Sequence, residues 1–348
     1  MYRLDDQYLR PKKAASLRKW HENHLEVREN LEVWHGEKAT ILPLRKDPEL
    51  QFGRGGVVDA QGNYVELSGI PLRVWNGYPM ENVEYRDQKV VYCGYMINQW
   101  GHFLIEGVCR LWYFLEQDAS IDKYIFFLDE NEQREIRGNY REFLQLLKIW
   151  DKLEFINRPM TFREVLVPEL SLRTHTYYYP KYREMFDVIA DNVIPDPSWE
   201  TPEKIYYSRS QFAKGIPYEF GFDCIDNFFE KNGYTILYPE KVPLGQMIFY
   251  IRNAKVVASL SGTLPHNMLF GTDGQKLVIL ERLVINVDHQ VCINQIRQLD
   301  VVHIDANYPI YTVDTHGPYI VGCNHLLCKY AEENGMKPPK GYYASDRY

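Results

Sequence analysis

Strand-like and helix-like segments alternate between Lys204 and Glu281, and this alternation constrains the fold more than any other feature of the chain. Short runs rich in Val, Ile and Tyr, among them KIYY, VVASL and KLVILE, are separated by amphipathic stretches such as CIDNFFEKNG and LGQMIFYIRN. This pattern is typical of βαβ units, whose strands lie parallel in one sheet. Because ligands of such sheets bind at the carboxyl ends of the strands, the residues that follow each strand are the first candidates for a site.

A similar alternation occupies residues 89–194, where KVVYCGY and KYIFFLD predict strands and GHFLIEGVCRLWYFLEQ predicts a helix. Residues 195–202, PDPSWETP, break helix and strand and predict a linker. The first 85 residues have weak periodicity and several turn signals, which favour short β-hairpins. We therefore expect a β-rich N-terminal extension at 1–85, an α/β domain at 86–197, and a second α/β domain with a C-terminal helix at 198–348.

Charge and hydropathy exclude several classes of protein. A net charge of −7 argues against a nucleic-acid partner that needs a broad basic face. No apolar run is long enough to span a bilayer and the first residues lack a secretory signal, so we expect a cytoplasmic protein. The basic residues between Arg10 and Lys19 have two interpretations, a solvated segment or a peripheral contact with anionic lipid at the inner face of the membrane.

The six cysteines are scattered, which favours reduced thiols over disulfides. Cys323 and Cys328 flank His325, but their spacing fits no common zinc site, so two thiols on a C-terminal helix is the favoured interpretation. The 27 tyrosines and 7 tryptophans could stack on sugar rings or simply fill the core.

The first candidate residues for catalysis share one predicted helix. His102, Glu106 and Arg110 are spaced four apart, so successive members lie on one helix face. A histidine beside a carboxylate can take a proton from a sugar hydroxyl. The structural alternative is a salt ladder, in which Glu106 pairs with Arg110.

The second group of candidates follows the predicted strand VVASL. Ser261, Gly262 and Thr263 could offer backbone and hydroxyl donors to a phosphate, and a helix entered at Pro265 would place His266 and Asn267 beside the same ligand. The alternative is a tight strand-to-helix turn with Thr263 as the helix cap.

Three further residues could complete a nucleotide site. Arg209, at the end of KIYYS, could neutralise a diphosphate leaving group, and Lys214 lies in the glycine-containing segment after it. Glu281 closes the strand KLVILE, a position from which a carboxylate can accept hydrogen bonds from ribose hydroxyls.

At these residues the sequence resembles glycosyltransferase family 61, in particular its bacterial capsular polysaccharide biosynthesis-type members. The resemblance covers roughly residues 89–305 and rests on three blocks: GYMINQWGHFLIEGVCRLW, IYYSRS, and the long block from YPEKV through SGTLPHNMLF to LVIL.

The resemblance implies a GT-B-like fold of two Rossmann-like α/β domains that face a cleft. It also implies inverting transfer of a sugar from a nucleotide-sugar donor to a carbohydrate or lipid-linked glycan acceptor. Gly101, His102 and Glu106 would belong to the acceptor side, with Arg209 and the residues around Ser261 on the donor side. The implied mechanism is a single in-line displacement, with Glu106 or His102 as the base and no metal ion, since the chain contains no Asp-x-Asp triplet.

Two departures from the family pattern keep other functions open. Many members have His-Gly where this chain has Ser261-Gly262, and many have Asn-Glu where this chain has the segment with Glu219. The alternatives are a catalytically silent partner in a polysaccharide assembly system, and another nucleotide-sugar enzyme such as an epimerase or a phosphorylase.

Overall fold

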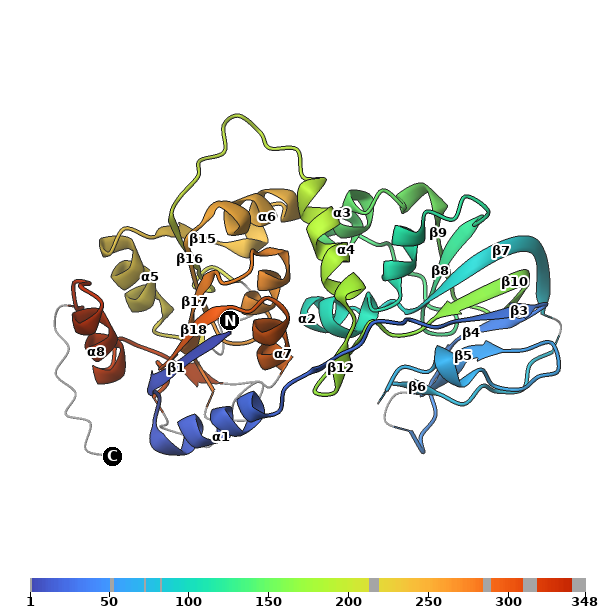
Figure 1. Cartoon of the computed structure of the whole chain (residues 1–348), viewed down its shortest axis with the longest axis horizontal. Coiled ribbons are helices and arrows are strands. Elements are labelled where there is room, and N and C mark those ends of the chain that lie inside the picture. Colours follow the sequence, from blue (N-terminus) through green and yellow to red (C-terminus); the bar gives the residue numbers. More distant parts are fainter. Residues whose placement is uncertain are drawn as a thin grey trace. The chain divides into compact units, whose positions relative to one another are not determined.

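A computed structural model divides the chain into two units (Figure 1). It describes residues 2–50, 53–71, 73–81, 83–212, 219–283, 289–308 and 318–339. One unit joins residues 1–25 to residues 193–348, and the other contains residues 26–192. We call them the discontinuous unit and the middle unit. This division differs from the three expected segments, because residues 1–85 do not stand apart from the rest.

The discontinuous unit is built on a parallel sheet, as the alternation between Lys204 and Glu281 predicts. Every neighbouring pair in it is parallel. In sheet order its strands are β1 (Arg3–Tyr8), β18 (Asp300–Asp305), β17 (Lys276–Glu281), β16 (Val256–Leu260), β13 (Lys204–Tyr207) and β15 (Thr235–Leu237). Val, Ile, Leu and Tyr dominate these strands apart from the edge strand β1, because a sheet covered on both faces buries successive side chains on both sides.

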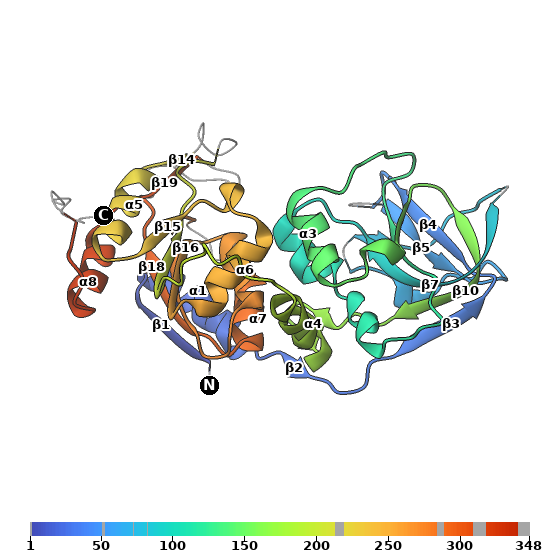
Figure 2. The ribbon, with the colours of Figure 1, turned by 90° about the horizontal axis from the view of Figure 1, so that it is seen from above.

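Helices cover the two faces of this sheet (Figures 1 and 2). One face carries α5 (Phe222–Lys231) and α8 (His325–Glu333), and the other carries α6 (Leu244–Asn253) and α7 (His289–Ile296). The predicted helices over CIDNFFEKNG and LGQMIFYIRN and near the C-terminus are therefore confirmed.

The N-terminal segment is the unexpected part of this unit. The helix α1 (Pro11–Glu22) begins with Pro11 in its first turn, and β1 precedes it. Strand β1 pairs with β18, so that Arg3 lies opposite Asp300. Periodicity within a short window does not reveal a pairing between residues so far apart in sequence.

The middle unit contains a mixed sheet. Strands β10 (Met160–Pro168), β7 (Glu84–Tyr95), β8 (Lys123–Phe127) and β9 (Leu153–Ile156) are parallel to one another. The strands β3 (Val33–Glu37), β4 (Thr40–Arg45), β5 (Gly53–Val58) and β6 (Val74–Trp75) extend the same sheet, with antiparallel pairs at β3–β10, β4–β10 and β4–β5. The predicted hairpin strands thus join the neighbouring sheet, because a small hairpin cannot bury a core of its own.

The predicted single helix over residues 101–117 is wrong. The segment is a short α-turn, α2 (Trp100–His102), then a π-helical turn, η2 (Phe103–Gly107), and then a 3₁₀ helix, η3 (Leu111–Glu116). The amide of Val108 bonds to the carbonyl of Phe103 at 3.0 Å, which is the i→i+5 bond of a π-turn. Regular helices of this unit are α3 (Gly138–Leu146) and α4 (Pro180–Asp191).

The remaining elements are short. They are β2 (Glu26–Val27), β11 (Leu172–Arg173), β12 (Tyr177–Tyr178), β14 (Glu219–Phe220), β19 (Tyr319–Ile320), η1 (Glu66–Ser68), η4 (Trp150–Lys152), η5 (Pro239–Lys241) and η6 (Leu264–Phe270). Strands β14 and β19 pair in parallel and form a small separate ladder. Within the described ranges, none of the helices has the length and apolar character needed to cross a bilayer.

Candidate active site

A histidine–carboxylate pair lies on the irregular helical segment of the middle unit. Nδ1 of His102 is 3.1 Å from Oε2 of Glu106, as the spacing of four residues predicts. Nε of Arg73 donates to the same Oε2 at 2.6 Å. Both side chains of the pair reach solvent, with 35% of His102 and 19% of Glu106 exposed. A hydrogen bond through Nδ1 places the proton of the neutral ring on that nitrogen, so Nε2 is the nitrogen that can accept a proton.

The environment of Glu106 keeps its carboxylate ionised. Burial alone would raise the pKa of Glu106, but the hydrogen bond from His102 and the charge of Arg73 outweigh burial and lower it. A carboxylate with a lowered pKa is a poor base and a good partner for a cation. The geometry therefore favours His102 over Glu106 as a proton acceptor, with Glu106 as the hydrogen-bond partner that orients the ring.

The predicted salt ladder between Glu106 and Arg110 is wrong. Arg110 is 1% exposed, and its Nη2 donates to the carbonyls of Leu67 at 2.6 Å and Gly69 at 2.8 Å. The π-turn changes the direction of the chain after Glu106, so Arg110 points into the core. Arg73 takes the position beside Glu106, and no sequence signal links it to a residue 33 positions later.

A second cluster gathers at the carboxyl edge of the parallel sheet in the discontinuous unit. The residues just beyond β13, β16 and β17 meet there because those strands are neighbours. Arg209 donates from Nε at 3.0 Å and from Nη2 at 2.6 Å to the carboxylate of Glu219. Arg282 donates from Nη1 to the same carboxylate at 3.1 Å. Among the described residues, two guanidinium groups thus share one buried carboxylate, and both remain partly exposed, Arg209 by 17% and Arg282 by 12%.

The turn after β16 holds Arg282 in place. The backbone amide of Arg282 donates to Oγ of Ser261 at 3.2 Å, and its Nε donates to the carbonyl of Ser261 at 2.8 Å. Gly262 has a φ of 120°, and a Cβ at this position would lie 2.7 Å from Nη2 of Arg282. The Ser-Gly pair therefore gives the guanidinium the space to lie against the turn.

Replacing Gly262 by Ala is expected to displace Arg282 and weaken the binding of an anionic ligand about tenfold, the loss expected when one charge-assisted hydrogen bond is disturbed. Gly274→Ala is the matched control, because Gly274 also has a positive φ, 74°, but a Cβ there meets nothing within 4 Å. Titration of both variants with a nucleoside diphosphate checks this result. Equal affinity in the two variants would contradict the contact between Gly262 and Arg282.

Two serines brace Arg209 on either side. Ser208 and Ser210 each donate a hydroxyl hydrogen bond of 2.6 Å to the carboxylate of Asp226 on α5. Burial raises the pKa of Asp226, and the two serine hydrogen bonds oppose this effect. The sequence predictions do not include Asp226 or Arg282, and they name Glu219 only where the chain departs from the family pattern. The Ser-Arg-Ser run and the position of Arg282 directly after Glu281 are signals that could have identified them.

Glu281 lies in a buried ionic network at the same edge of the sheet. Its carboxylate is 2.8 Å from Nδ1 of His303 and 3.6 Å from Nζ of Lys13. Lys13 also contacts Asp305 at 3.1 Å. Burial alone would raise the pKa of Glu281, but Lys13 and the hydrogen bonds from His303 and Ser261 lower it. With a side chain that is 4% exposed, Glu281 holds α1 against the sheet.

The other described residues that the sequence predicts for the nucleotide-sugar site lie outside the arginine cluster or make only contacts within the fold. The segment after Thr263 is the 3₁₀ helix η6 and not an α-helix, and the Thr263 side chain does not cap it. Nδ1 of His266 is 2.8 Å from Oε1 of Gln290 on α7, and Asn267 donates to the carbonyl of Leu264 at 2.9 Å. Lys214 lies outside the described residues.

The structure gives no support for a metal site at Cys323, His325 and Cys328. Across the described part of the chain, no group of three or more His, Cys, Asp or Glu side chains is placed to hold a metal ion. No disulfide joins any of the six cysteines, all of which lie within the described ranges.

Comparisons with known proteins identify the family. None of the curated proteins matches the chain. Among solved structures it is similar to the bacterial iron-containing dodecameric glycosyltransferase TibC from enterotoxigenic E. coli H10407, at 10% identity over 73% of this chain and 79% of that chain, with a TM-score of 0.27. A likeness at this level places no residue of the site. A family model described as Glycosyltransferase 61 matches residues 100–278, just over half of the 348 residues, and this stretch contains His102, Glu106, Arg209 and the Ser261–Gly262 turn. The chain therefore belongs to glycosyltransferase family 61.

Proposed function

We propose that this protein is an inverting glycosyltransferase that moves a sugar from a nucleotide-activated donor to a glycan or lipid-linked acceptor, in the biosynthesis of a capsular or other extracellular polysaccharide. Membership in family 61 supports glycosyl transfer. The observation that carries the proposal is the pair of arginines, Arg209 and Arg282, held by Glu219 at the carboxyl edge of a parallel sheet. Such an edge is where parallel α/β sheets bind nucleotides.

The arginine pair is suited to a diphosphate. Two guanidinium groups against one carboxylate leave a net positive charge in a half-buried site, where charge-assisted hydrogen bonds are strong. As the bond between the anomeric carbon and the diphosphate breaks, negative charge develops on the diphosphate. Arg209 and Arg282 stabilise that charge.

The pair of His102 and Glu106 is suited to activate the acceptor. His102 takes the proton of the acceptor hydroxyl through Nε2, the hydroxyl oxygen bonds to the anomeric carbon, and the diphosphate leaves from the opposite face. Glu106 stabilises the resulting imidazolium. One displacement inverts the configuration of the sugar. We propose that the middle unit binds the acceptor and the discontinuous unit the donor, in a GT-B arrangement, with no metal ion required.

The two departures from the family pattern have a physical interpretation in this site. Glu219 binds both arginines, so it can take the part of the acidic residue in the family's Asn-Glu segment. Ser261 accepts two hydrogen bonds from Arg282, so the turn supports a cation in this chain without a histidine. Both observations favour an active enzyme over a silent partner.

A thermal-shift screen against nucleotide sugars and free nucleoside diphosphates, with EDTA or with Mg²⁺ or Mn²⁺, tests the proposal. We expect one nucleotide family to raise the melting temperature in EDTA, because a ligand at about 100 times its Kd stabilises the folded state by about 2.7 kcal/mol. Product analysis with that donor should then show sugar transfer only when a glycan acceptor is present. No shift at millimolar nucleotide would favour a silent partner, and turnover without acceptor would favour an epimerase or a phosphorylase.

A further inference from the structure

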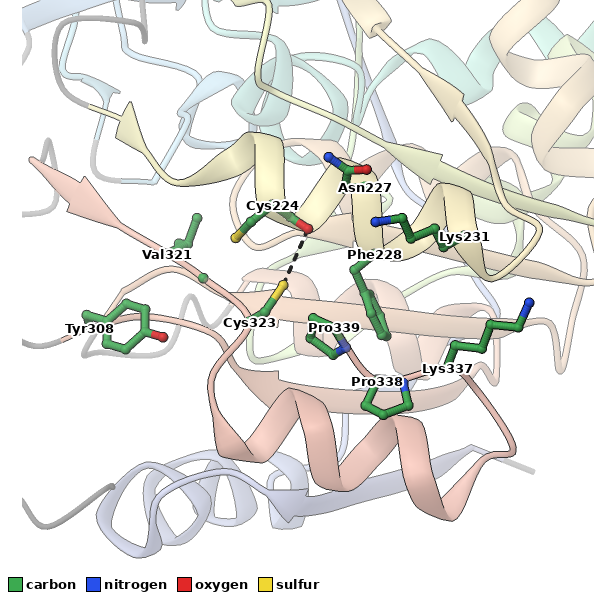
Figure 3. A pocket seen from close by; sticks show the side chains of 11 residues that line it. Cys224, Asn227, Phe228, Lys231, Tyr308, Val321, Cys323, Lys337, Pro338 and Pro339 are labelled. Carbon is green, nitrogen blue, oxygen red and sulfur yellow. Dashed lines mark hydrogen bonds between the residues drawn. The ribbon is translucent and has the colours of Figure 1, made fainter. Parts of the chain in front are cut away.

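A pocket of about 410 Å³ opens in the discontinuous unit beside the first turns of α5 (Figure 3). Its lining includes two cysteines from distant parts of the sequence together with aromatic and proline side chains: Cys224, Phe228, Tyr308, Cys323 and Pro338. None of these residues belongs to the arginine cluster or to the His102–Glu106 pair.

The backbone fixes the two cysteines close together. Strand β14 pairs with β19, and the amide of Val321 donates to the carbonyl of Phe220 at 3.0 Å. The chains approach so closely that a Cβ on Gly221 would lie 2.0 Å from the carbonyl oxygen of Val321. Cys224 and Cys323 follow directly after this contact, and Sγ of Cys323 donates to the carbonyl oxygen of Cys224 at 3.3 Å (Figure 3).

The two thiols differ in accessibility and in acidity. Cys224 is exposed and Cys323 is buried. The neighbouring Cys323 thiol lowers the pKa of Cys224 to about 7, although burial opposes this shift. In its neutral form the Cys224 thiol donates to the carbonyl of Gly221 at 3.0 Å. The neighbouring Cys224 thiol and burial raise the pKa of Cys323. Cys224 is therefore both the more accessible and the more acidic thiol of the pair.

The pKa of three other cysteine thiols is raised, whereas that of Cys224 is lowered. Burial raises the pKa of the Cys93 and Cys109 thiols, both of which lie in the core. It also raises the pKa of Cys328, which is partly exposed on α8. An attack by a thiolate at neutral pH should thus be selective for Cys224.

We propose that Cys224 and Cys323 form a redox-active thiol pair, in which Cys224 reacts with a peroxide that enters the pocket and Cys323 resolves the product as a disulfide. In the first step the Cys224 thiolate attacks one peroxide oxygen, the O–O bond breaks, and Cys224 becomes a sulfenic acid as hydroxide or alkoxide leaves. In the second step the Cys323 sulfur displaces the sulfenic oxygen, which leaves as water. Two thiols lose two electrons and two protons, and the peroxide is reduced to two molecules of water, or to water and an alcohol.

A disulfide between Cys224 and Cys323 would join α5 to the segment that follows β19. Strand β14, directly before α5, carries Glu219, and β19 carries Tyr319, whose ring lies 4.3 Å from the guanidinium carbon of Arg282. The reaction of the two cysteines does not depend on glycosyl transfer, because alkylation and disulfide formation are measured directly on the sulfur atoms.

The first test is alkylation of the folded full-length protein by iodoacetamide at pH values from 5 to 9, followed by peptide mass spectrometry. At pH 7 we expect Cys224 to react about fivefold to tenfold faster than Cys328, since a thiol of ordinary or raised pKa is at most a few per cent ionised there. Because the thiolate reacts, the rate at Cys224 should rise with pH through a midpoint near 7. In Cys323→Ser the midpoint should move, whereas Cys328→Ser is a control that should leave it unchanged.

The second test is treatment of the wild-type protein with hydrogen peroxide, followed by blocking of free thiols and peptide mapping. We expect a disulfide between the peptides of Cys224 and Cys323, reversed by dithiothreitol. Cys323→Ser should stop at a sulfenic acid on Cys224 that dimedone traps. Equal alkylation of Cys224 and Cys328 in the wild-type protein, or peroxide oxidation without a link between Cys224 and Cys323, would overturn the proposal.

Discussion

Replacing Glu106 by Gln is expected to lower kcat by about 10²- to 10⁴-fold, the range that general acid–base groups contribute, while the fold and donor binding are retained. His102 and Arg73 both donate to the same oxygen, Oε2 of Glu106. A glutamine can present its carbonyl oxygen at this position and accept both hydrogen bonds. The substitution therefore removes the negative charge and preserves the geometry, so that the imidazolium formed at His102 loses its counter-ion.

A matched control exists elsewhere in the middle unit. Glu164 lies 3.7 Å from Nδ1 of His35 on the surface, and both side chains are more exposed than those of the site pair. Glu164→Gln should change kcat by less than about twofold, because exposed pairs are weak. Initial rates with saturating donor and acceptor give the comparison. A wild-type rate in Glu106→Gln would remove Glu106 from the mechanism and leave His102 as the only base of the pair.

The two residues should also act as a unit. His102→Gln removes the proton acceptor itself, so the double variant His102→Gln/Glu106→Gln should be no slower than His102→Gln alone. Additive losses in kcat would show that Glu106 acts independently of His102.

The stability of these variants provides a check that does not depend on activity. Since the folded state lowers the pKa of Glu106, this carboxylate stabilises the fold above its ordinary pKa and loses that contribution as the pH falls through its folded-state pKa. The difference in unfolding free energy between the wild type and Glu106→Gln should therefore shrink on acidification from pH 7 to pH 3 in urea titrations. A constant difference would contradict the ion pair with Arg73.

The sequence predicts the parts of this site that local rules determine. Alternating strands and helices predict a parallel sheet, and parallel strands place their carboxyl ends at one edge, so Arg209 and Ser261 could be assigned to the same region without a structure. The spacing of four residues likewise predicts the contact between His102 and Glu106. Both predictions depend only on residues that lie close together in the sequence.

The parts that sequence reasoning missed depend on contacts between distant segments. Arg73 reaches Glu106 from a loop, and Glu219 reaches Arg282 from a two-residue strand whose partner, β19, lies about 100 residues later. The π-turn after His102 is a local feature, but it directs Arg110 onto two carbonyls of a distant segment. The periodicity of apolar residues along the sequence does not indicate contacts between such distant segments.

Replacing Arg209 by Met is expected to reduce kcat/KM for the donor by about 10²- to 10³-fold, the cost of removing one preorganised donor to a developing anion. Arg209 is the more exposed of the two side chains, at 17% against 12% for Arg282, whose Nε also donates to the carbonyl of Ser261, so Arg209 is the more accessible to a ligand. Arg282→Met should therefore have the smaller effect on kcat.

Conservative variants separate charge from geometry at this cluster. Arg209→Lys keeps the charge but cannot reproduce the two contacts with Glu219, so we expect an intermediate loss of about tenfold. Arg18→Met is the matched control, since Arg18 makes a similar two-nitrogen contact with Asp6 in the same unit, at 2.6 and 2.9 Å, with a side chain that is 62% exposed. It should leave kcat/KM unchanged, because an exposed pair of this kind contributes little.

Calorimetric titration with the nucleoside diphosphate distinguishes binding from catalysis in these variants. If Arg209 stabilises mainly the leaving group, Arg209→Met should lower kcat more than it weakens the affinity for the diphosphate, because charge on the diphosphate increases as the bond to the sugar breaks. Equal losses in affinity and in kcat/KM would show that Arg209 binds the ground state and the transition state alike. An unchanged kcat/KM in both Arg209→Met and Arg282→Met would place the diphosphate away from the carboxyl edge of the sheet.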